Sequence, residues 1–379
     1  MSLPSFKMRN ITIPTPIIQG GMGIGYANFK LAGTVANNGG LGIISSAALD
    51  RVVGSRLGRK FKAREACAQE VQDAKELCNG KPIGINIMVA TVNQYEDSVL
   101  GSMDGGVDVI ISGAGLPIKL PAIAETHPRK DEVALVPIVS SARALKILIR
   151  KWGKYNRVPD AVVVEGPLAG GHIGWAKKEE ALHEKNKLEN LVAEVVELAD
   201  EYNIPVVAAG GIHEYIDIQK YLDLGCVAVQ MGTRFLATFE SGATQQYKEQ
   251  LISCKEEDIK LADGIGSPCG LLFRVIKTAP FYQEAINRQR APRCDKGYVL
   301  VNNECDAKTS TNSFCICNGL LSSSLVVTPE KELYTVGARA GELTEIISVE
   351  KLMKELTTPP VQVNKIKITQ NLSSDSLPM

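Results

Sequence analysis

The sequence lacks an excess of charge of either sign. Its 379 residues include 42 Lys and Arg and 42 Asp and Glu. A strongly basic chain attracts nucleic acid or an anionic membrane, so this balance argues against both as partners and leaves small neutral or anionic ligands open. Hydrophobic residues make up 45% of the chain, which excludes wholesale disorder and allows a large buried core.

Segments that carry a protein to or through a membrane are also missing. The N-terminal residues MSLPSFKMRN contain no apolar core of a secretory signal. No run reads as a membrane span, and the longest early uncharged stretch, Ile11 to Phe29, is interrupted by Pro14, Pro16 and four glycines. We therefore expect a cytoplasmic protein.

The paired C-x2-C knuckles of ordinary zinc modules are absent. Five of the nine cysteines are dispersed, and four crowd together late in the chain: Cys294, Cys305, Cys315 and Cys317. In a protein without a secretory signal a disulfide scaffold is not expected. Four thiolates in one folded loop could still ligate a metal or an iron–sulfur cluster, so these residues are weak metal candidates, and the alternative is that they are idle.

What the sequence does contain is a regular alternation of short apolar runs and helix-length segments. Parallel strands buried on both faces read as continuous apolar runs. We read strands at 16–19, 40–45, 83–89, 107–112, 133–139, 161–165, 205–209 and 227–231, and helices at 64–78, 142–151, 188–202 and 215–224. This alternation predicts an α/β fold, a (β/α)8 TIM barrel, which needs about 250 residues. An open doubly wound sheet or two ordinary domains are the alternatives.

After residue 231 the alternation stops. We expect a helix over about 244–260, a glycine-containing turn at 263–270 and an amphipathic helix over 343–356. The predicted organisation is a barrel over 1–285, completed in one interpretation by 326–356, then a Cys-rich loop-rich insertion over 286–325 and a polar tail over 357–379. Cys269, in the turn, is either a nucleophile or simply a small residue.

The strand ends carry the unusual residues, and in such barrels catalytic groups lie at the carboxyl ends of strands. The first strand ends in QGGMGIG (19–25), whose glycines let the backbone approach a flat ligand. The third contains Asn86 in GINIMV (84–89), whose amide could bond to the edge of such a ligand. A flexible turn and a satisfied core polar group are the structural alternatives.

The seventh and eighth strands end in AAGGI (208–212) and QMGTRF (230–235), each followed by a helix. Glycine amides at a helix start, together with the Thr233 hydroxyl, can bind an anion. Barrels of this class frequently bind phosphate at these two loops. The two signals together predict a phosphate site.

The sixth strand runs into PLAGGHIGW (167–175). Gly170 and Gly171 flatten the backbone beside His172, so that the imidazole is free to face a bound ring. Histidine suits proton transfer near neutral pH because its unperturbed pKa is about 6.5. A lone histidine is more often structural, but the glycine-flanked strand end favours a catalytic role.

Five ordered motifs, QGGMG, GINIMV, EGPLAGGHIG, PVVAAGGI and QMGTRF, resemble the FMN-binding barrels of the nitronate monooxygenase and 2-nitropropane dioxygenase family, which includes the flavin-dependent enoyl-acyl-carrier-protein reductases. The resemblance covers residues 10–285. It implies FMN as cofactor and His172 as the catalytic residue, which assists deprotonation of a nitroalkane or protonation of a reducible substrate. The FMN contacts that it implies are Gly21, Met22, Asn86, Glu165, Gly170, Gly210, Gly211, Gln230, Met231, Gly232 and Thr233.

Two positions near His172 bear on the substrate. Leu168 stands where an acidic residue is usual in the family. Ile173 is similar to the residue of the enoyl reductases, whereas many nitronate monooxygenases carry arginine there. The carboxylate that relatives usually carry at position 168 is therefore missing from this chain.

The resemblance makes an FMN-dependent oxidation of nitronates or nitroalkanes by dioxygen the leading hypothesis. The alternative is an NAD(P)H-dependent enoyl-acyl-carrier-protein reductase, in which the nicotinamide docks over the flavin because the chain has no Rossmann G-x-G-x-x-G turn. A non-catalytic flavin-binding module and a non-flavin phosphate-binding barrel enzyme are further alternatives. The physiological substrate and a homo-oligomeric state are left open by the sequence.

Overall fold

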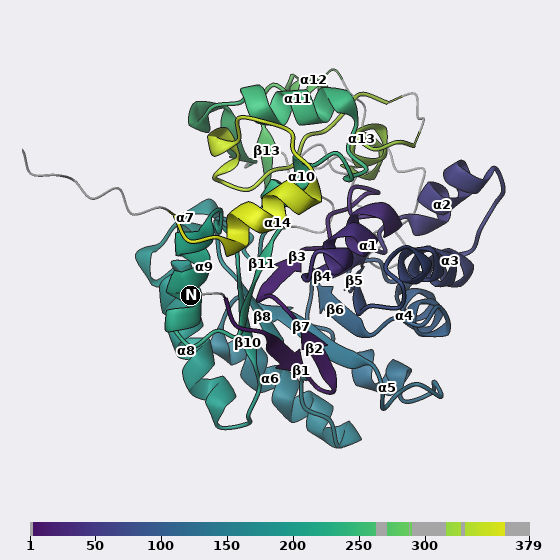
Figure 1. Cartoon of the computed structure of the whole chain (residues 1–379). Helices are drawn as coiled ribbons and strands as arrows, with labels where there is room; N and C mark the ends of the chain where they lie inside the picture. The colour runs from purple at the N-terminus through teal and green to yellow at the C-terminus, as the bar shows by residue number, and fades with distance from the viewer. Residues whose placement is uncertain (1–2, 263–270, 288, 290–315, 327–329, 361–379) are drawn as a thin grey trace, which may run out of the picture.

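Eight parallel strands close into a barrel in the computed structural model, which describes residues 3–262, 271–287, 289, 316–326 and 330–360. Each strand pairs with the next along the chain, and the eighth pairs with the first (Figure 1). The strands are β3 (Ile17–Gln19), β4 (Leu41–Ser45), β5 (Ile83–Met88), β6 (Val109–Gly113), β7 (Ala134–Val139), β8 (Val162–Glu165), β10 (Val206–Ala209) and β11 (Ala228–Met231). The predicted (β/α)8 fold and all eight strands are confirmed.

Helices cover the outside of this barrel, including the four that the sequence predicted. In α6 (Ala142–Trp152), the Ser141 side chain caps the first turn and accepts a hydrogen bond from the Ala144 amide. Its buried face has the helical spacing of Leu145, Leu148, Ile149 and Trp152. The outer helices are α1 (Phe29–Asn37), α2 (Leu49–Leu57), α3 (Ala63–Leu77), α4 (Tyr95–Asp104), α5 (Leu120–Ala124), α6, α8 (Leu188–Asp200) and α9 (Tyr215–Asp223).

Both faces of the barrel strands are buried, which explains why they read as continuous apolar runs. Ile17 and Val164 pack outward against the helices, whereas Ile18 and Val163 fill the interior. A hairpin of β1 (Phe6–Met8) and β2 (Ile11–Ile13) adds Phe6, Met8 and Ile13 to the interior core. The sequence analysis did not predict this hairpin.

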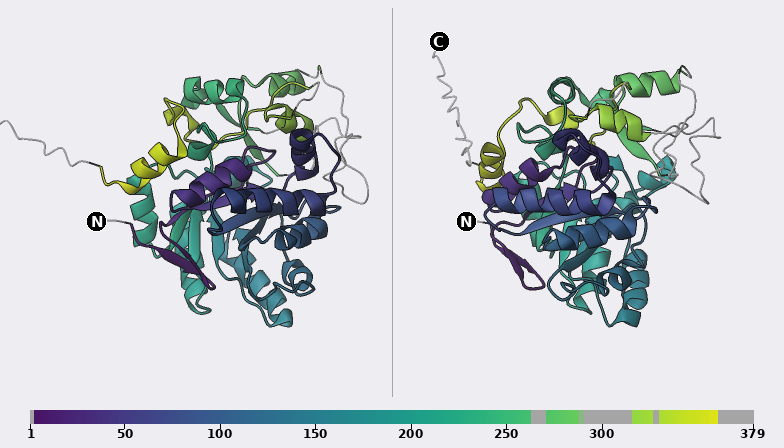
Figure 2. Two further views of the ribbon diagram at one scale, coloured as in Figure 1. Left: turned by 45° about the vertical axis from the view of Figure 1, so that its right-hand side comes forward. Right: turned by 90° about the vertical axis from the view of Figure 1, so that its right-hand side faces the viewer.

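A second hydrophobic core lies over the carboxyl end of the barrel, in the upper part of Figures 1 and 2. Tyr26 from the barrel contributes to it, as does the segment 333–343. We call the elements around this core the cap: α10 (Thr233–Leu236), α11 (Gln245–Ser253), β12 (Ile259–Ala262), β13 (Phe273–Ile276), α12 (Pro280–Ile286), α13 (Ile316–Ser322) and the segment 330–343.

The chain then returns to the barrel. Helix α14 (Val349–Thr357) contacts α1 and α9 and buries Val349, Leu352, Met353 and Leu356 against the outer barrel core. No helix within the described ranges is both long and apolar enough to cross a lipid bilayer.

Two predicted helices are too long. The helix expected over 244–260 ends at Ser253, and residues 259–262 instead form β12, which pairs antiparallel with β13. The helix expected over 343–356 begins only after Ser348, because Ile347 is held in a backbone bridge with Thr238. The four residues Ile259–Ala262 are too few for the sequence to distinguish a strand from the end of a helix.

Several predictions lie outside the described residues. These are Cys269, Cys294, Cys305 and Cys315, and the tail from residue 361 onward. The domain boundaries proposed from the sequence stay a prediction.

Gly42 is a position where a side chain would separate β4 from α1, because an added Cβ would lie 1.9 Å from the carbonyl oxygen of Ala32. We expect Gly42→Ala to lower the free energy of unfolding by about 3 kcal/mol, as overpacking in a rigid core does. At Gly153 an added Cβ meets nothing within 4 Å, so Gly153→Ala should change it by less than about 1 kcal/mol. Equal thermal midpoints for the two variants would contradict this packing.

Candidate active site

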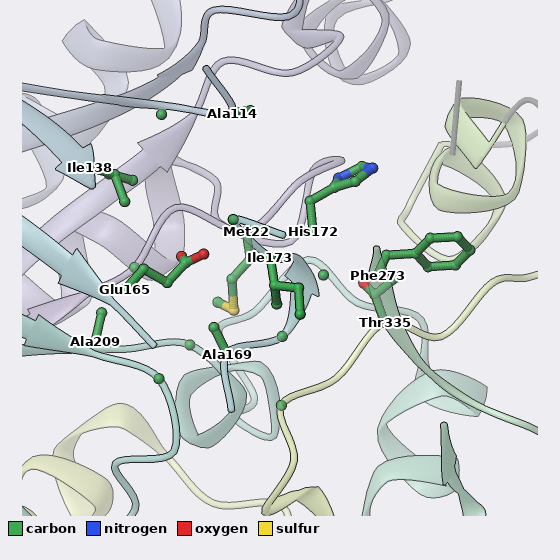
Figure 3. A pocket seen from close by; sticks show the side chains of 18 of the residues that line it. Met22, Ala114, Ile138, Glu165, Ala169, His172, Ile173, Ala209, Phe273 and Thr335 are labelled. Carbon is green, nitrogen blue, oxygen red and sulfur yellow. The ribbon is translucent and has the colours of Figure 1, made fainter. Parts of the chain in front are cut away.

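A cavity of about 700 Å³ lies between the carboxyl ends of the barrel strands and the cap (Figure 3). The lining draws on the loops after all eight strands, as expected from the parallel closure. All twelve residues that the sequence assigned to catalysis or cofactor binding lie in it: Gly21, Met22, Asn86, Glu165, Gly170, His172, Gly210, Gly211, Gln230, Met231, Gly232 and Thr233.

The floor of the cavity is the glycine-rich segment after β3. A Cβ added to Gly21 would lie 2.2 Å from the Cβ of Asn86, so only glycine lets the backbone reach this side chain. Asn86 itself comes from β5 and is half-buried. Met22 follows at once and stands in the middle of the view in Figure 3. The arrangement leaves a surface that a flat ligand can approach closely.

The loop after β10 forms one side of the cavity. Gly210 and Gly211 have φ values of 102° and 79°, in the left-handed region that favours glycine. The following turn is fixed by Asp217, which accepts hydrogen bonds from the amides of His213 at 2.8 Å and Glu214 at 3.0 Å. The backbone after β10 therefore turns sharply beside the cavity.

The loop after β11 meets the cap at Thr233. The Thr233 hydroxyl oxygen accepts a hydrogen bond from the amide of Gly337 at 2.9 Å. Gly337 also lines the cavity. The loops after β10 and β11, which the sequence predicts as a phosphate site, both line this side of the cavity, and Gly337 of the cap lies against the second of them.

Two arginines flank this side of the cavity. Arg339 donates to the carbonyl of Gly211 at 3.2 Å and pairs with Asp217. Arg234 pairs with Glu355 of α14 at 2.8 Å and contacts Nε2 of His213 at 3.3 Å. Both guanidinium charges on this side are therefore paired with carboxylates, Arg339 also with Glu342.

His213 lies between these groups as a neutral imidazole. Burial, and then the nearby charge of Arg234, lower its pKa to about 4. Sequence analysis missed this residue and both arginines, although Arg234 stands inside a motif that it singled out.

Gln230 carries an unsatisfied group. Its side chain is buried at the end of β11, and its Oε1 has no hydrogen-bond partner among the described residues. Leaving a buried polar atom unpaired costs about 1–3 kcal/mol. A ligand in the cavity that donates a hydrogen bond here would remove this cost.

Glu165 ends β8 and points into the cavity (Figure 3). Burial raises the pKa of its carboxyl to about 7, and the nearby His172 acts in the opposite direction. The group therefore holds and releases a proton near neutral pH.

His172 is held by a strand that the sequence did not reveal. It lies in β9 (Gly171–His172), which pairs antiparallel with β13 of the cap, so that Phe273 is opposite His172 and Arg274 opposite Gly171. The His172 and Phe273 rings have centroids 6.1 Å apart, inclined at 54°. The cap therefore positions the imidazole.

Other lining residues were not predicted. The ends of β6 and β7 could have been found, because the carboxyl ends of all strands meet in a barrel. The cap contributions could not, since they come from segments far away in the sequence. The principal additions are Ala114, Leu116, Ile138, Ser140, Phe273, Leu320, Thr335 and Val336.

Of the four late cysteines only Cys317 is described, and it lines the cavity. Within the described ranges, no three potential metal-ligating side chains gather at one point. The metal prediction for the four cysteines as a group stays a prediction.

Comparison with known proteins gives consistent similarities. A "Probable nitronate monooxygenase" of Staphylococcus haemolyticus is 28% identical over 283 residues, covering 67% of this chain and 74% of that protein. FabK from Thermotoga maritima has a TM-score of 0.66 and 27% identity, covering 91% of this chain and 92% of that one. A nitroalkane oxidase from Streptomyces ansochromogenes, at 21% identity, shares the fold with a TM-score of 0.65 over 91% and 95% of the two chains.

The family match extends over both the barrel and the cap. Residues 4–103 and 90–359 match the family described as nitronate monooxygenase. The matched ranges contain every strand of the barrel and all twelve predicted site residues. The chain therefore belongs to the nitronate monooxygenase family and is a flavin-dependent oxidoreductase.

Proposed function

We propose that this enzyme is an FMN-dependent nitronate monooxygenase, which oxidises nitronates or nitroalkanes with dioxygen. The observation that carries the proposal is the convergence of His172, Glu165 and the glycine loops on one cavity. The family match and the names of the relatives support the same reaction class.

Three features of the cavity fit FMN. Gly21 lets the backbone lie directly against Asn86 in the cavity lining, and the unpartnered Oε1 of Gln230 can accept a hydrogen bond from a bound group. Thr233 would meet a phosphate between the loops after β10 and β11. Arg234 and Arg339 are paired with Glu355 and Asp217, so the donors of these loops, rather than an unpaired positive charge, would hold the phosphate.

The predicted contacts follow from this placement. Gly21 and Met22 would back the ring, Asn86 would bond to its polar edge, and Glu165 and Gly170 would border it. The phosphate and its polyol chain would be held by Gly210, Gly211, Gln230, Met231, Gly232 and Thr233. The flavin supplies the electron-transfer chemistry when bound, and the protein supplies orientation and proton handling.

His172 is the residue that we propose to accept the proton from the carbon beside the nitro group of a nitroalkane. Histidine suits this transfer near neutral pH. Ile138, Ile173 and Phe273 line the same cavity, and their apolar side chains would help to keep water from the reacting carbon. A substrate that arrives as the nitronate has already lost this proton and needs only to be oriented.

One observation favours the enoyl-reductase alternative. Ile173, next to His172, is buried and lines the cavity. This isoleucine occupies the position where many nitronate monooxygenases have an arginine. NAD(P)H would then be the reductant and would dock over the flavin.

The test of the function is anaerobic mixing of the flavin-loaded enzyme with nitroethane or its nitronate. Both should bleach the visible flavin absorbance, and dioxygen should restore it. His172→Ala should slow reduction by nitroethane on the order of 100-fold or more and reduction by the nitronate much less, because only the neutral compound needs a base.

His127→Ala is the matched control, since His127 lies before β7, away from the cavity, and pairs with Asp104. Both rates should stay unchanged in it. No bleaching by either compound, together with rapid NADH consumption driven by an enoyl thioester, would assign the enzyme to the reductases. Unchanged reduction by nitroethane in His172→Ala would show that His172 is not the base, and a flavin that none of these compounds reduces would indicate a non-catalytic module.

The raised pKa of Glu165 should make the free energy of unfolding depend on pH. Because its folded pKa of about 7 exceeds its ordinary 4.5, the folded protein keeps a proton that the unfolded chain has lost. The stability that this residue contributes is therefore present at low pH and is lost as the pH rises through that window.

Glu165→Gln, which cannot ionise, should accordingly raise the thermal midpoint of the flavin-free protein only slightly at pH 5 and clearly at pH 8. Glu194→Gln, on the exposed face of α8, should change it little at either pH. A gain for Glu165→Gln that does not grow with pH would show that the carboxyl is not held neutral by burial.

A further inference from the structure

Arg274 is a buried cation for which the proposed chemistry gives no role. It lies in β13 and is only 4% exposed. Burial alone lowers the pKa of its guanidinium to about 10, with no contribution from a described carboxylate. Burying a charge without a partner of opposite sign is costly. A function for this side chain should therefore be sought in the groups that it does contact.

Those groups are carbonyls of a single short segment. The guanidinium donates to the carbonyl of Pro167 at 2.8 Å through Nη2 and to the carbonyl of Ala169 through Nη1. Both belong to the segment 166–170, which joins Glu165 of β8 to His172 of β9. We call this segment the connecting loop.

Contacts on several sides restrain the connecting loop. The Gly166 amide donates to the carbonyl of Ala209 at 2.9 Å, and the Ala169 amide closes a turn to the carbonyl of Gly166 at 3.2 Å. The loop also contains Gly170 and is followed by Gly171 with φ of 69°, and glycine loses more conformational freedom on ordering than any other residue. The cap restrains it on a second side, where the amide of Ala338 donates to the carbonyl of Leu168 at 3.1 Å. A Cβ on Gly170 would lie 2.6 Å from the amide nitrogen of Gly337.

We propose that Arg274 is a positioning residue, which fixes the connecting loop from the cap and thereby sets where His172 stands in the cavity. The strand register supports this, because Arg274 lies opposite Gly171 while its neighbour Phe273 lies opposite His172. Arg274 itself does not line the cavity. Its effect on the reaction is therefore exerted through the backbone.

Arg157 provides a matched control. It also donates to two carbonyls, those of Lys130 and Val133, each at 2.9 Å. It lies before β8, at the amino-terminal end of the barrel strands, and does not line the cavity. Both arginines donate to two backbone carbonyls, but Arg157 is also paired with Asp160 at 2.8 Å. Arg157 is therefore a control for the loss of carbonyl contacts at the opposite end of the barrel.

The first experiment measures amide hydrogen exchange in the flavin-loaded protein, with peptides that cover residues 166–174. Arg274→Met should raise the exchange rate of this segment at least about tenfold, Arg274→Lys should raise it less, and Arg157→Met should leave it unchanged. Should the methionine variant not fold, Arg274→Lys carries the comparison with Arg157→Lys. Unchanged exchange in a folded Arg274 variant would overturn the proposal.

The second experiment is kinetic and rests on the proposed function. Arg274→Met should slow anaerobic flavin reduction by nitroethane on the order of 10- to 100-fold, as a small misplacement of a catalytic group does. In a His172→Ala background the same change should cost less than about twofold, because the group to be positioned is gone. Equal losses in both backgrounds would overturn a role through His172.

The two experiments separate the two proposals. If the parent enzyme fails to oxidise nitroethane and its nitronate, the proposed function fails, while hydrogen exchange still decides whether Arg274 holds the connecting loop.

Discussion

Pairing of β11 with β3 closes the ring of strands, with Val229, Gln230 and Met231 opposite Ile17, Ile18 and Gln19. Because every strand of the ring runs in the same direction, every following loop leaves from the same end. Segments as far apart in the sequence as Gly21 and Thr233 therefore line one cavity. The cavity that we propose as the FMN site, with His172 and Glu165 in its lining, depends on this closure.

The cap completes the lining of the cavity and pairs with the strand that carries His172. It adds Phe273, Thr335 and Val336 to the lining, and its strand β13 extends the backbone pairing to His172. Beside the loop after β11 it supplies Gly337, which donates to Thr233. The barrel loops thus form one side of the cavity, and the cap pairs with the strand that carries His172.

The sequence predicted the barrel well because its strands are buried on both faces and read as uninterrupted apolar runs. Site residues at strand ends, such as Asn86 and Gln230, could be found for the same reason. Pairing of β9 with β13 could not, since β9 has only two residues and its partner lies about a hundred positions later. The roles of His213 and Arg339 depend on packing between distant segments, which no local pattern encodes.

We propose that this cavity holds FMN. Denaturing the purified protein and measuring the absorption spectrum and mass of the released chromophore would test this most directly. We expect a yellow protein that releases FMN at one molecule per chain, without covalent attachment. A colourless protein that also fails to take up added FMN, or one that releases a different cofactor, would contradict it.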